Sequence, residues 1–587
     1  TMEGLDQNKK ETVVNAFAKE GGLQCGFCTP GIIMKVWPIL NQGFLTEKEV
    51  NKSLNSNLCR CTGYKKITKS CLLAAEAIRN NSTIELSKSS GKVGESLPKY
   101  DSIRLAKGEA PYVADLKFEG MLHGALKFSD HPRAKILRID FSKAEKLTGV
   151  LKVFTAKDIP DQRYTGLIVA DWPLMISVGE TTRYIGDVLA GIVAENEKIA
   201  RQAIDLIEVE YEVLTPITDP LKALDSKSPK LHEDGNLLSN TEINRGDSIK
   251  AEKDSAFVTK GTYKTQRIEH AFLELECCIA KPWKGGIEIF SQSQGVYEDR
   301  NSISKILGIP KEKVKVILMP NGGGFGGKED ISVQGHAALF AHLLQAPVRV
   351  ALTRPESLCM HPKRHPMSME MSLGCDKNGK LTFVRANIIG DTGAYASVGM
   401  KVLERAAGHA TSVYSIPIVN IQSRAVYTNN VPCGAMRGFG VNQINFAIES
   451  CIDELCLKGE FDRWQIRYDN AIKPGERTST GQKIVSGIGI QKTLMAVKKH
   501  FENAKYAGIA CGMKNTGIGN GVPDDSRVKV IIDSPEQITI HHGWTEMGQG
   551  VFTMAVQFLC EATGLNPDLV SVKVDTSQEV PCGMTTA

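Results

Sequence analysis

Hydrophobic positions in the first eighty residues recur at helical spacing and are separated by helix start and stop signals. Residues 11–20 read as a helix that stops at Gly21-Gly22, and Pro30 can open a second helix. Thr46-Glu-Lys-Glu49 has the form of a capping box for a third helix, and residues 64–78 continue as a fourth. The pattern predicts a small helical bundle over residues 1–79.

Beyond this bundle the pattern changes twice. Residues 80–100 are rich in Ser, Lys, Gly and Pro, which is typical of an interdomain linker. Residues 188–193 form a continuous apolar strand, Ile199, Ala203 and Leu206 repeat at helical spacing, and residues 207–213 alternate apolar with acidic. Further strands are expected at 314–319, 527–532 and 538–542, and helices at 333–344, 441–457 and 552–563. We therefore predict an α+β multidomain fold.

The bulk composition is that of a large globular protein. A chain of 587 residues, 42% apolar and 23% charged, is expected to form about three or four domains. The net charge of +5 is spread over 71 basic and 66 acidic residues, which gives no support to a nucleic-acid target. No apolar run reaches the roughly 18 to 20 residues that span a bilayer, and no signal-peptide core is present. We expect a cytoplasmic protein without a membrane partner.

The two ends of the chain are unusual. The first residue is Thr1 rather than Met, and the last residues before Ala587 carry no polar tail or helix cap. We therefore expect a fragment that is truncated at both ends.

Four of the fifteen cysteines form two close pairs. Cys25-Gly-Phe-Cys28 and Cys59-Arg-Cys61 lie about thirty residues apart, a separation that a helical hairpin closes without strain. Four thiolates suit either a [2Fe-2S] cluster or a structural zinc ion. The C-x-C pair favours iron, because the paired ligands of zinc are usually separated by two to four residues. Four unrelated buried thiols are the simpler alternative.

A glycine-rich loop, Gly322-Gly-Gly-Phe-Gly-Gly-Lys-Glu329, follows the strand expected at 314–319. It fits the G-x-x-x-x-G-K pattern of a phosphate loop, but Glu329 stands where such a loop needs Ser or Thr for magnesium. Glycine lets the backbone approach a bulky ligand, and Phe325 is the one side chain that the loop presents. A structural turn is the alternative.

These segments together resemble the xanthine oxidase and xanthine dehydrogenase family of molybdenum hydroxylases. Gln24-Cys-Gly-Phe-Cys-Thr-Pro-Gly31 and Asn57-Leu-Cys-Arg-Cys-Thr-Gly-Tyr64 look like the helical [2Fe-2S] domain of that family, and the glycine loop looks like its molybdenum-contacting segment. Three further segments resemble cofactor loops in the family's order: Ser291-Gln-Ser-Gln294, Met436-Arg-Gly-Phe-Gly440 and Thr545-Glu-Met-Gly-Gln-Gly550. The resemblance covers essentially the whole chain.

The resemblance implies a domain order. A helical [2Fe-2S] domain occupies 1–79, with a remnant of a preceding ferredoxin-like domain in 1–5 whose own cluster ligands are missing. A linker over 80–100 leads to an α/β hammerhead domain over 101–220, and molybdopterin-binding domains follow over 235–472 and, incomplete, over 480–587. The linker leaves no room for a flavin domain, so no FAD is expected in this chain. Electrons are expected to pass to a separate FAD-binding subunit or a small electron carrier.

The resemblance also assigns site residues. The expected metal ligands are Cys25, Cys28, Cys59 and Cys61. Residues expected beside molybdopterin, alone or as a dinucleotide, are Gln24, Cys61, Gln294, Phe325, Gly326, Arg437, Met547 and Gln549. Gln294 would face the apical oxo ligand, and Phe439 would stack on the substrate. The glutamate that acts as general base lies downstream of Gln549 in this family, beyond Ala587, so no residue here receives that role.

Glu329 and Arg405 are the two residues that favour a purine substrate. In purine-oxidising relatives both residues would bind and polarise the heterocycle, and Gln294 is the third expected catalytic residue. Aldehyde-oxidising relatives tend to have apolar residues at the positions of Glu329 and Arg405. Arg can stabilise negative charge on a purine oxygen, and a carboxylic acid can share a proton with a ring nitrogen. Surface ion pairs are the alternative for each. Asn520 stands where a second aromatic residue would hold the substrate, which weakens the case for a purine and leaves a different N-heterocycle as an alternative.

We therefore expect a hydroxylase that oxidises a purine such as xanthine or hypoxanthine, or a related N-heterocycle, with oxygen from water. An aldehyde oxidoreductase of the same family is the alternative. A carbon monoxide dehydrogenase is disfavoured, because Cys433 stands four residues before Arg437, unlike the copper-ligating loop of that group. A non-catalytic electron-transfer subunit would bind iron but no molybdenum. A homodimer of the full-length chain fits the resemblance, and the fragment is expected to be inactive without its general base.

Overall fold

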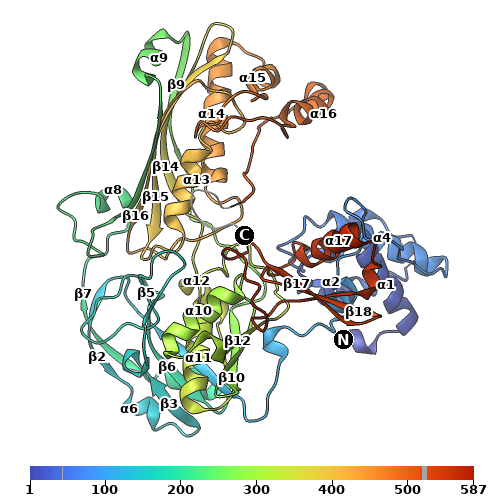
Figure 1. The fold of residues 1–587 in the computed structure, drawn as a ribbon, viewed down its shortest axis with the longest axis vertical. Coiled ribbons are helices and arrows are strands. Elements are labelled where there is room, and N and C mark those ends of the chain that lie inside the picture. The colour runs from blue at the N-terminus through green and yellow to red at the C-terminus, as the bar shows by residue number, and fades with distance from the viewer. Residues whose placement is uncertain (43, 87, 518–524, 587) are drawn as a thin grey trace.

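The computed structural model describes residues 1–42, 44–86, 88–517 and 525–586. The helical N-terminal part lies beside the C-terminal helix and strands, and two larger parts built on sheets make up the rest (Figure 1). Among the described residues, no helix combines the length and the apolar character needed to cross a membrane.

The N-terminal part is the predicted helical bundle. Its helices are α1 (Gln7–Glu20), α2 (Thr29–Val36), α3 (Glu47–Leu54), α4 (Lys65–Arg79) and the short α5 (Ser102–Lys107). Asp6 caps α1 by accepting a hydrogen bond from the Lys9 backbone N–H at 2.9 Å, and α1 ends at Gly21, whose φ is +64°. The predicted capping box at Thr46 is present. Apolar faces of α1, α2 and α4 pack together as one core.

The segment expected to be a linker is held against the C-terminal part of the chain. Described residues between 80 and 101 form no helix or strand. The Gln557 side chain donates to the Lys92 and Glu95 carbonyl oxygens at 3.0 and 3.1 Å, and the Tyr100 backbone N–H donates to the Thr553 hydroxyl at 2.9 Å. The polar composition of this segment therefore reflects an extended, solvated path along a surface, not a free tether.

A seven-stranded sheet joins two regions that the sequence analysis assigned to different domains. Its strand order is β12-β11-β10-β13-β1-β6-β3. The strands are β1 (Leu122–Phe128), β3 (Val150–Phe154), β6 (Val188–Ala194), β10 (Cys277–Trp283), β11 (Gly286–Ser291), β12 (Val314–Leu318) and β13 (Val348–Ala351). Because β13 pairs in parallel with β1, the hammerhead region and the following region share one sheet and one core.

Helices and small ribbons surround this sheet. The helices are α6 (Ser142–Glu145), α7 (Glu197–Ile204), α10 (Val296–Leu307), α11 (Val333–Leu344) and α12 (Arg354–Met360). Two-stranded ribbons are formed by β2 (Ala134–Asp140) with β7 (Glu208–Val213) and by β4 (Tyr164–Thr165) with β5 (Trp172–Pro173). β6 is buried along its whole length, as its continuous apolar run predicts.

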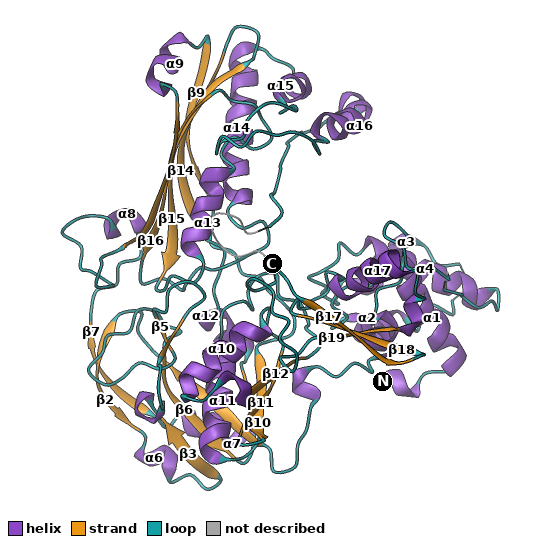
Figure 2. Ribbon diagram, viewed as in Figure 1, coloured by secondary structure: helices purple, strands orange, loops and turns teal. Residues whose placement is uncertain are grey.

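A second, five-stranded sheet has the order β8-β16-β15-β14-β9. Its strands are β8 (Leu237–Arg245), β9 (Phe257–Lys264), β14 (Met367–Cys375), β15 (Leu381–Gly393) and β16 (Ile418–Tyr427). Figure 2 shows α13 (Gly399–Gly408) and α14 (Val441–Gly459) lying along it, and both pack their apolar faces on the strands. The remaining helices of this region are α8 (Pro220–Ala223), α9 (Ser248–Asp254), α15 (Arg463–Asn470) and α16 (Ile490–Asn503).

The C-terminal part contains a three-stranded sheet and one long helix. The strands are β17 (Val528–Ser534), β18 (Gln537–His542) and β19 (Val570–Lys573), and the helix is α17 (Val551–Thr563). The predicted strands and helices of this region are confirmed to within a few residues. The loop between β18 and α17 faces the cysteine loop of the N-terminal bundle, which brings the N-terminal and C-terminal parts of the chain into contact.

Candidate cofactor site

The four paired cysteines converge on one side of the helical bundle. The Cys61 thiol lies 3.3 Å from the Cys25 sulfur, and Cys59 is hydrogen-bonded to both Cys28 and Cys61. A hydrogen bond from Cys61 lowers the pKa of Cys25, and one from Cys28 lowers the pKa of Cys59. Thiolates are the metal-binding form of cysteine, so each pair contains one sulfur that ionises readily.

The sulfurs are grouped but are not centred on a single point. In the part of the chain that the structure describes, one group of three or more His, Cys, Asp or Glu ligand atoms lies mutually within 4.8 Å, and it contains no cysteine. A mononuclear zinc site brings its four ligands within bonding distance of one ion. The wider spread of the sulfurs fits two irons better than one zinc ion.

The cysteine loop packs directly on the loop between β18 and α17. A Cβ atom at Gly548, whose φ is +113°, would lie 2.5 Å from the backbone nitrogen of Cys25. The Tyr112 hydroxyl also donates to the Cys25 carbonyl oxygen at 2.9 Å. Only glycine permits this approach and this φ together, so Gly548 is required where the two loops touch.

Gln294 joins the glycine loop to the end of the described chain. Its side-chain oxygen accepts from the Gly326 backbone N–H at 2.9 Å, and its amide donates to the Thr586 carbonyl oxygen at 2.7 Å. A Cβ atom at Gly324 would lie 2.4 Å from the same oxygen and 3.1 Å from the Met547 sulfur. Gln294, Gly326 and Met547, which the sequence analysis placed beside the pterin, thus occupy one region.

The second expected loop meets the glycine loop through the backbone. The Arg437 N–H donates to the Phe325 carbonyl oxygen at 3.0 Å, and a Cβ atom at Gly326 would lie 2.7 Å from Ala435. Phe325 and Phe439 have φ of +58° and +34°, which bulky residues rarely adopt. Such strain persists where the surrounding structure fixes the backbone, often at binding sites.

Glu329 is enclosed directly after this loop. Its pKa is raised from 4.5 to about 8, mainly by burial and also by the nearby Asp330 and Glu298, against a lowering hydrogen bond to Thr585. The Gln294 amide lies 3.5 Å from one of its oxygens. A cavity of about 10 Å³, with room for about one water molecule, adjoins Glu329 on the side lined by Thr165, Trp172 and Glu298.

Arg405 lies on α13, on the side of the site formed by the second loop. Its guanidinium donates to the Gly517 carbonyl oxygen at 3.2 Å. Gly440 packs against the Val402 carbonyl oxygen of the same helix, which places Phe439 next to α13. Asn520, where a second aromatic residue was expected, lies outside the described residues.

Two expected cofactor residues are exposed. Gln24 precedes the first cysteine with its side chain in solvent. Gln549 folds back on its own loop, where its amide donates to the Thr545 carbonyl oxygen and its oxygen accepts from the Met547 N–H, both at 2.8 Å. Both residues border the contact between the cysteine loop and the loop at Gly548, so they flank the region where the pterin is expected.

Lys328 does not face a phosphate. Its ammonium group is buried and binds Gln292, with Asn321 and Glu274 each at 3.3 Å, and it lies 4.7 Å from the Phe272 ring centre. The phosphate-loop alternative is therefore wrong in geometry as well as in sequence, because the lysine supports the loop from behind. Sequence reasoning missed Glu274, which follows the short apolar run Ala271-Phe-Leu273 and belongs to no motif.

Cys433 is a core thiol. It is fully buried, with its sulfur 3.7 Å from the Arg364 carbonyl oxygen, and burial raises its pKa to about 12. A neutral buried thiol is a poor metal ligand.

The chain matches family models along nearly its whole length. These are the [2Fe-2S] binding domain over 1–72, the aldehyde oxidase and xanthine dehydrogenase a/b hammerhead domain over 107–215, and molybdopterin cofactor-binding domains over 231–471 and 488–587. Only residues 73–106 separate the first two models, and no flavin domain is among the matches.

Individual relatives agree with these matches. The chain is 36% identical over 485 residues to a probable xanthine dehydrogenase subunit of Bacillus subtilis, covering 81% of this chain and 65% of that protein. It is 35% identical over 403 residues to the nicotinate dehydrogenase large molybdopterin subunit of Eubacterium barkeri, covering 68% of this chain and 94% of that protein. The solved aldehyde oxidoreductase from Desulfovibrio gigas is similar with a TM-score of 0.92 at 25% identity, covering 98% of this chain and 67% of that one.

The fold and the converging loops define a chain built from [2Fe-2S]-binding and molybdopterin-binding domains. The chain belongs to the molybdenum hydroxylase family that contains xanthine dehydrogenases and aldehyde oxidoreductases. The predicted family, α+β multidomain fold and cofactors are thereby confirmed. The chain spans slightly less than two thirds of the length of its Bacillus subtilis relative.

The residues present fit both cofactors. Four convergent sulfurs suit a [2Fe-2S] cluster. The loop from Thr545 to Gly550 carries a buried hydroxyl, Thr545 Oγ1, that has no hydrogen-bond partner among the described residues. Buried polar groups in proteins are normally satisfied, so an unpaired hydroxyl in this loop marks a place for a polar ligand.

Proposed function

We propose that this chain is part of a molybdenum hydroxylase that oxidises a purine, or a closely related N-heterocycle, with oxygen derived from water. The observation that carries the proposal is Glu329, whose buried carboxyl has a pKa of about 8 and is therefore largely protonated at neutral pH. A protonated carboxyl donates a hydrogen bond, which an aldehyde substrate does not need but a ring nitrogen of a heterocycle can accept.

Several residues around that carboxyl have separate roles in the proposed reaction. When bound, the molybdenum cofactor supplies the oxidising metal centre and the [2Fe-2S] cluster supplies a one-electron acceptor. Gln294 holds the glycine loop closed and fixes one oxygen of Glu329. We assign Phe439 as a flat surface for the ring and Arg405 as the cation that stabilises negative charge on an exocyclic oxygen.

The organisation around the site belongs to the same proposal. We assign residues 1–79 to the [2Fe-2S] domain, 101–220 to the hammerhead domain, and 235–472 and 480–587 to molybdopterin binding. We assign Cys25, Cys28, Cys59 and Cys61 as cluster ligands, with Gln24, Phe325, Arg437, Met547 and Gln549 beside the pterin. A separate FAD-binding subunit or a small carrier then takes the electrons.

Steady-state assays of the full-length enzyme test the substrate. We expect kcat/KM to be highest for xanthine or hypoxanthine, and lower for nicotinate and for an aromatic aldehyde. Glu329→Gln should lower kcat/KM for the purine by about tenfold or more while changing aldehyde oxidation little, because a hydrogen bond to the substrate ring is lost or weakened. Preference for the aldehyde, or equal losses for both substrates, would refute the role of Glu329.

Metal analysis of the same protein separates the remaining alternatives. At least two irons and one molybdenum per chain are expected from the [2Fe-2S] cluster of this chain and one pterin cofactor, and the ferredoxin-like domain expected before this chain would add two more irons. Iron without molybdenum would identify a non-catalytic electron-transfer subunit. Stoichiometric copper would identify a carbon monoxide dehydrogenase and would contradict the burial of Cys433.

A further inference from the structure

Arg60 stands between two cluster cysteines in the sequence, yet its side chain reaches another part of the fold. Its Nε atom donates to the His270 carbonyl oxygen at 2.8 Å, and a terminal nitrogen donates to the Glu269 carbonyl oxygen at 3.3 Å. The guanidinium group thus bridges two consecutive carbonyls. Its planar set of donors suits this task, whereas the single ammonium head of lysine does not.

His270 connects the segment held by Arg60 to both cofactor loops. Its ring is fully buried and its Nε2 atom lies 2.7 Å from the Ala435 carbonyl oxygen, just before Arg437. A Cβ atom at Gly327 would lie 2.8 Å from the same ring, so the imidazole also packs on the glycine loop. Burial lowers the pKa of His270 to about 3, so the ring is neutral and its Nε2 donates to the carbonyl.

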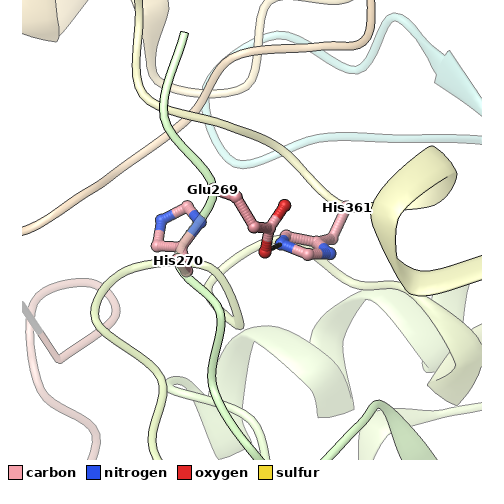
Figure 3. A group of neighbouring side chains, drawn as sticks. All are labelled: Glu269, His270 and His361. Carbon is pink, nitrogen blue, oxygen red and sulfur yellow. Dashed lines mark ion pairs between the residues drawn. The ribbon is translucent and has the colours of Figure 1, made fainter. Parts of the chain in front are cut away.

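Glu269 fixes the same segment from its other side. Figure 3 shows Glu269, His270 and His361 as a compact group, which has the spacing of a metal site. The Glu269 carboxylate, however, lies 2.9 Å from His361 Nε2 and 2.7 Å from the Lys363 ammonium, and His361 Nδ1 lies 3.0 Å from Glu276. Burial opposes charging of His361, but hydrogen bonds to Glu269 and Glu276 raise its pKa overall. Two carboxylates face two cations, which leaves no charge for a metal ion to balance.

We propose that Arg60 is a positioning residue that locks the cluster-bearing loop onto both cofactor loops through the rigid Glu269–His270 segment. The contact between Gly548 and Cys25 holds one side of the cysteine loop, and the Arg60 bridge holds the other. Two separated anchors prevent the helical domain from rocking about either one. The geometry between cluster and pterin is then set by Arg60 as well as by the cysteines.

The inference rests on the proposed function only in treating the cluster and the pterin as electron partners. Arg60→Ala removes both hydrogen bonds, and Arg60→Lys keeps the charge but not the bridge. Arg104→Ala, at an exposed arginine of α5, is the matched control. Hydrogen exchange of the full-length protein reports docking directly and requires no substrate.

In Arg60→Ala, we expect amide exchange at residues 25–28 and 545–550 to accelerate by about tenfold, the scale of one lost charge-assisted hydrogen bond. The exchange rate of these amides in Arg60→Lys should lie between the rates in Arg60→Ala and in the natural protein. The rate in Arg104→Ala should equal that of the natural protein. Iron content should be unchanged in all three variants. In the loaded enzyme, the magnetic splitting between reduced cluster and Mo(V) should change in Arg60→Ala alone or most strongly.

Unchanged exchange in Arg60→Ala would overturn the inference, and so would loss of iron, because a docking residue leaves the cluster intact. Faster exchange in a protein that binds no molybdenum would support the docking role and reject the proposed function instead. Equal acceleration in Arg60→Ala and Arg104→Ala would also overturn the inference, since a general loss of positive charge would then explain it.

Discussion

Glu329 gives the folded protein a pH dependence that can be measured without any cofactor. Its carboxyl is buried, and its pKa is raised from 4.5 to about 8, first by burial and then by Asp330 and Glu298. Replacement by Gln keeps the shape and removes the ionisation. Because the Gln294 amide lies 3.5 Å from one Glu329 oxygen, a Gln side chain can still offer an oxygen there.

The sign of the effect follows from the raised pKa. Below pH 4.5 both folded and unfolded chains hold the proton, so ionisation of Glu329 costs nothing. Between pH 4.5 and about 8 the unfolded chain loses the proton while the folded chain retains it, and the free energy of unfolding falls as pH rises. At about 1.4 kcal/mol per unit, the full difference corresponds to an upper limit of roughly 5 kcal/mol above pH 8.

The assay is the difference in melting temperature between Glu329→Gln and the natural protein at pH 5, 7 and 9. We expect Glu329→Gln to melt at a higher temperature than the natural protein, by a difference that increases with pH and is largest at pH 9. Glu312→Gln, at an exposed position after α10, is the control and should show no such trend. A difference that stays constant with pH, or that grows toward acid, would refute the reasoning about burial of Glu329.

Two further substitutions test the cluster and the contact beside it. Cys59→Ser should remove the iron and its visible absorbance, whereas Cys71→Ser, at a buried core thiol of α4, should keep the iron. Iron retained in Cys59→Ser would exclude Cys59 as a ligand. Gly548→Ala should lower the melting temperature more than Gly550→Ala, because both have positive φ but only Gly548 would place a Cβ against Cys25. Strain of this kind costs about 1–3 kcal/mol, and equal shifts would show that the contact with Cys25 adds nothing.

Local elements of this fold could be predicted from the sequence because their signals are local. The capping box at Thr46, the stop at Gly21 and the buried run of β6 each depend on residues within a few positions of one another. α11 has the bounds that were predicted for it, Val333–Leu344. The sharing of one sheet by β1 and β13 has no such signal, because parallel pairing of distant strands is decided by the packing of the whole core.

In the candidate site, too, some residues could be predicted from sequence motifs and others could not. Motifs identified Gln294, Phe325 and Met547, and the structure brings them together. Sequence reasoning did not find Glu274 or His361, because an isolated Glu or His outside any motif resembles many structural residues. Their importance lies in partners from distant segments, which only the folded chain shows.

The glycine loop resembles a phosphate loop in sequence, and only the contacts with remote segments show the difference. In both cases glycine allows the backbone to come close to a ligand, but the direction of the following lysine differs. Lys328 turns inward to Glu274 and stacks on Phe272, so its charge neutralises a buried carboxylate. The loop thereby presents backbone and an aromatic ring outward instead of a cation. Such a surface suits a large, flat cofactor whose position is fixed by shape and backbone hydrogen bonds. In the proposed function, the protonated carboxyl of Glu329 and the cation of Arg405 are then the groups left to act on the substrate.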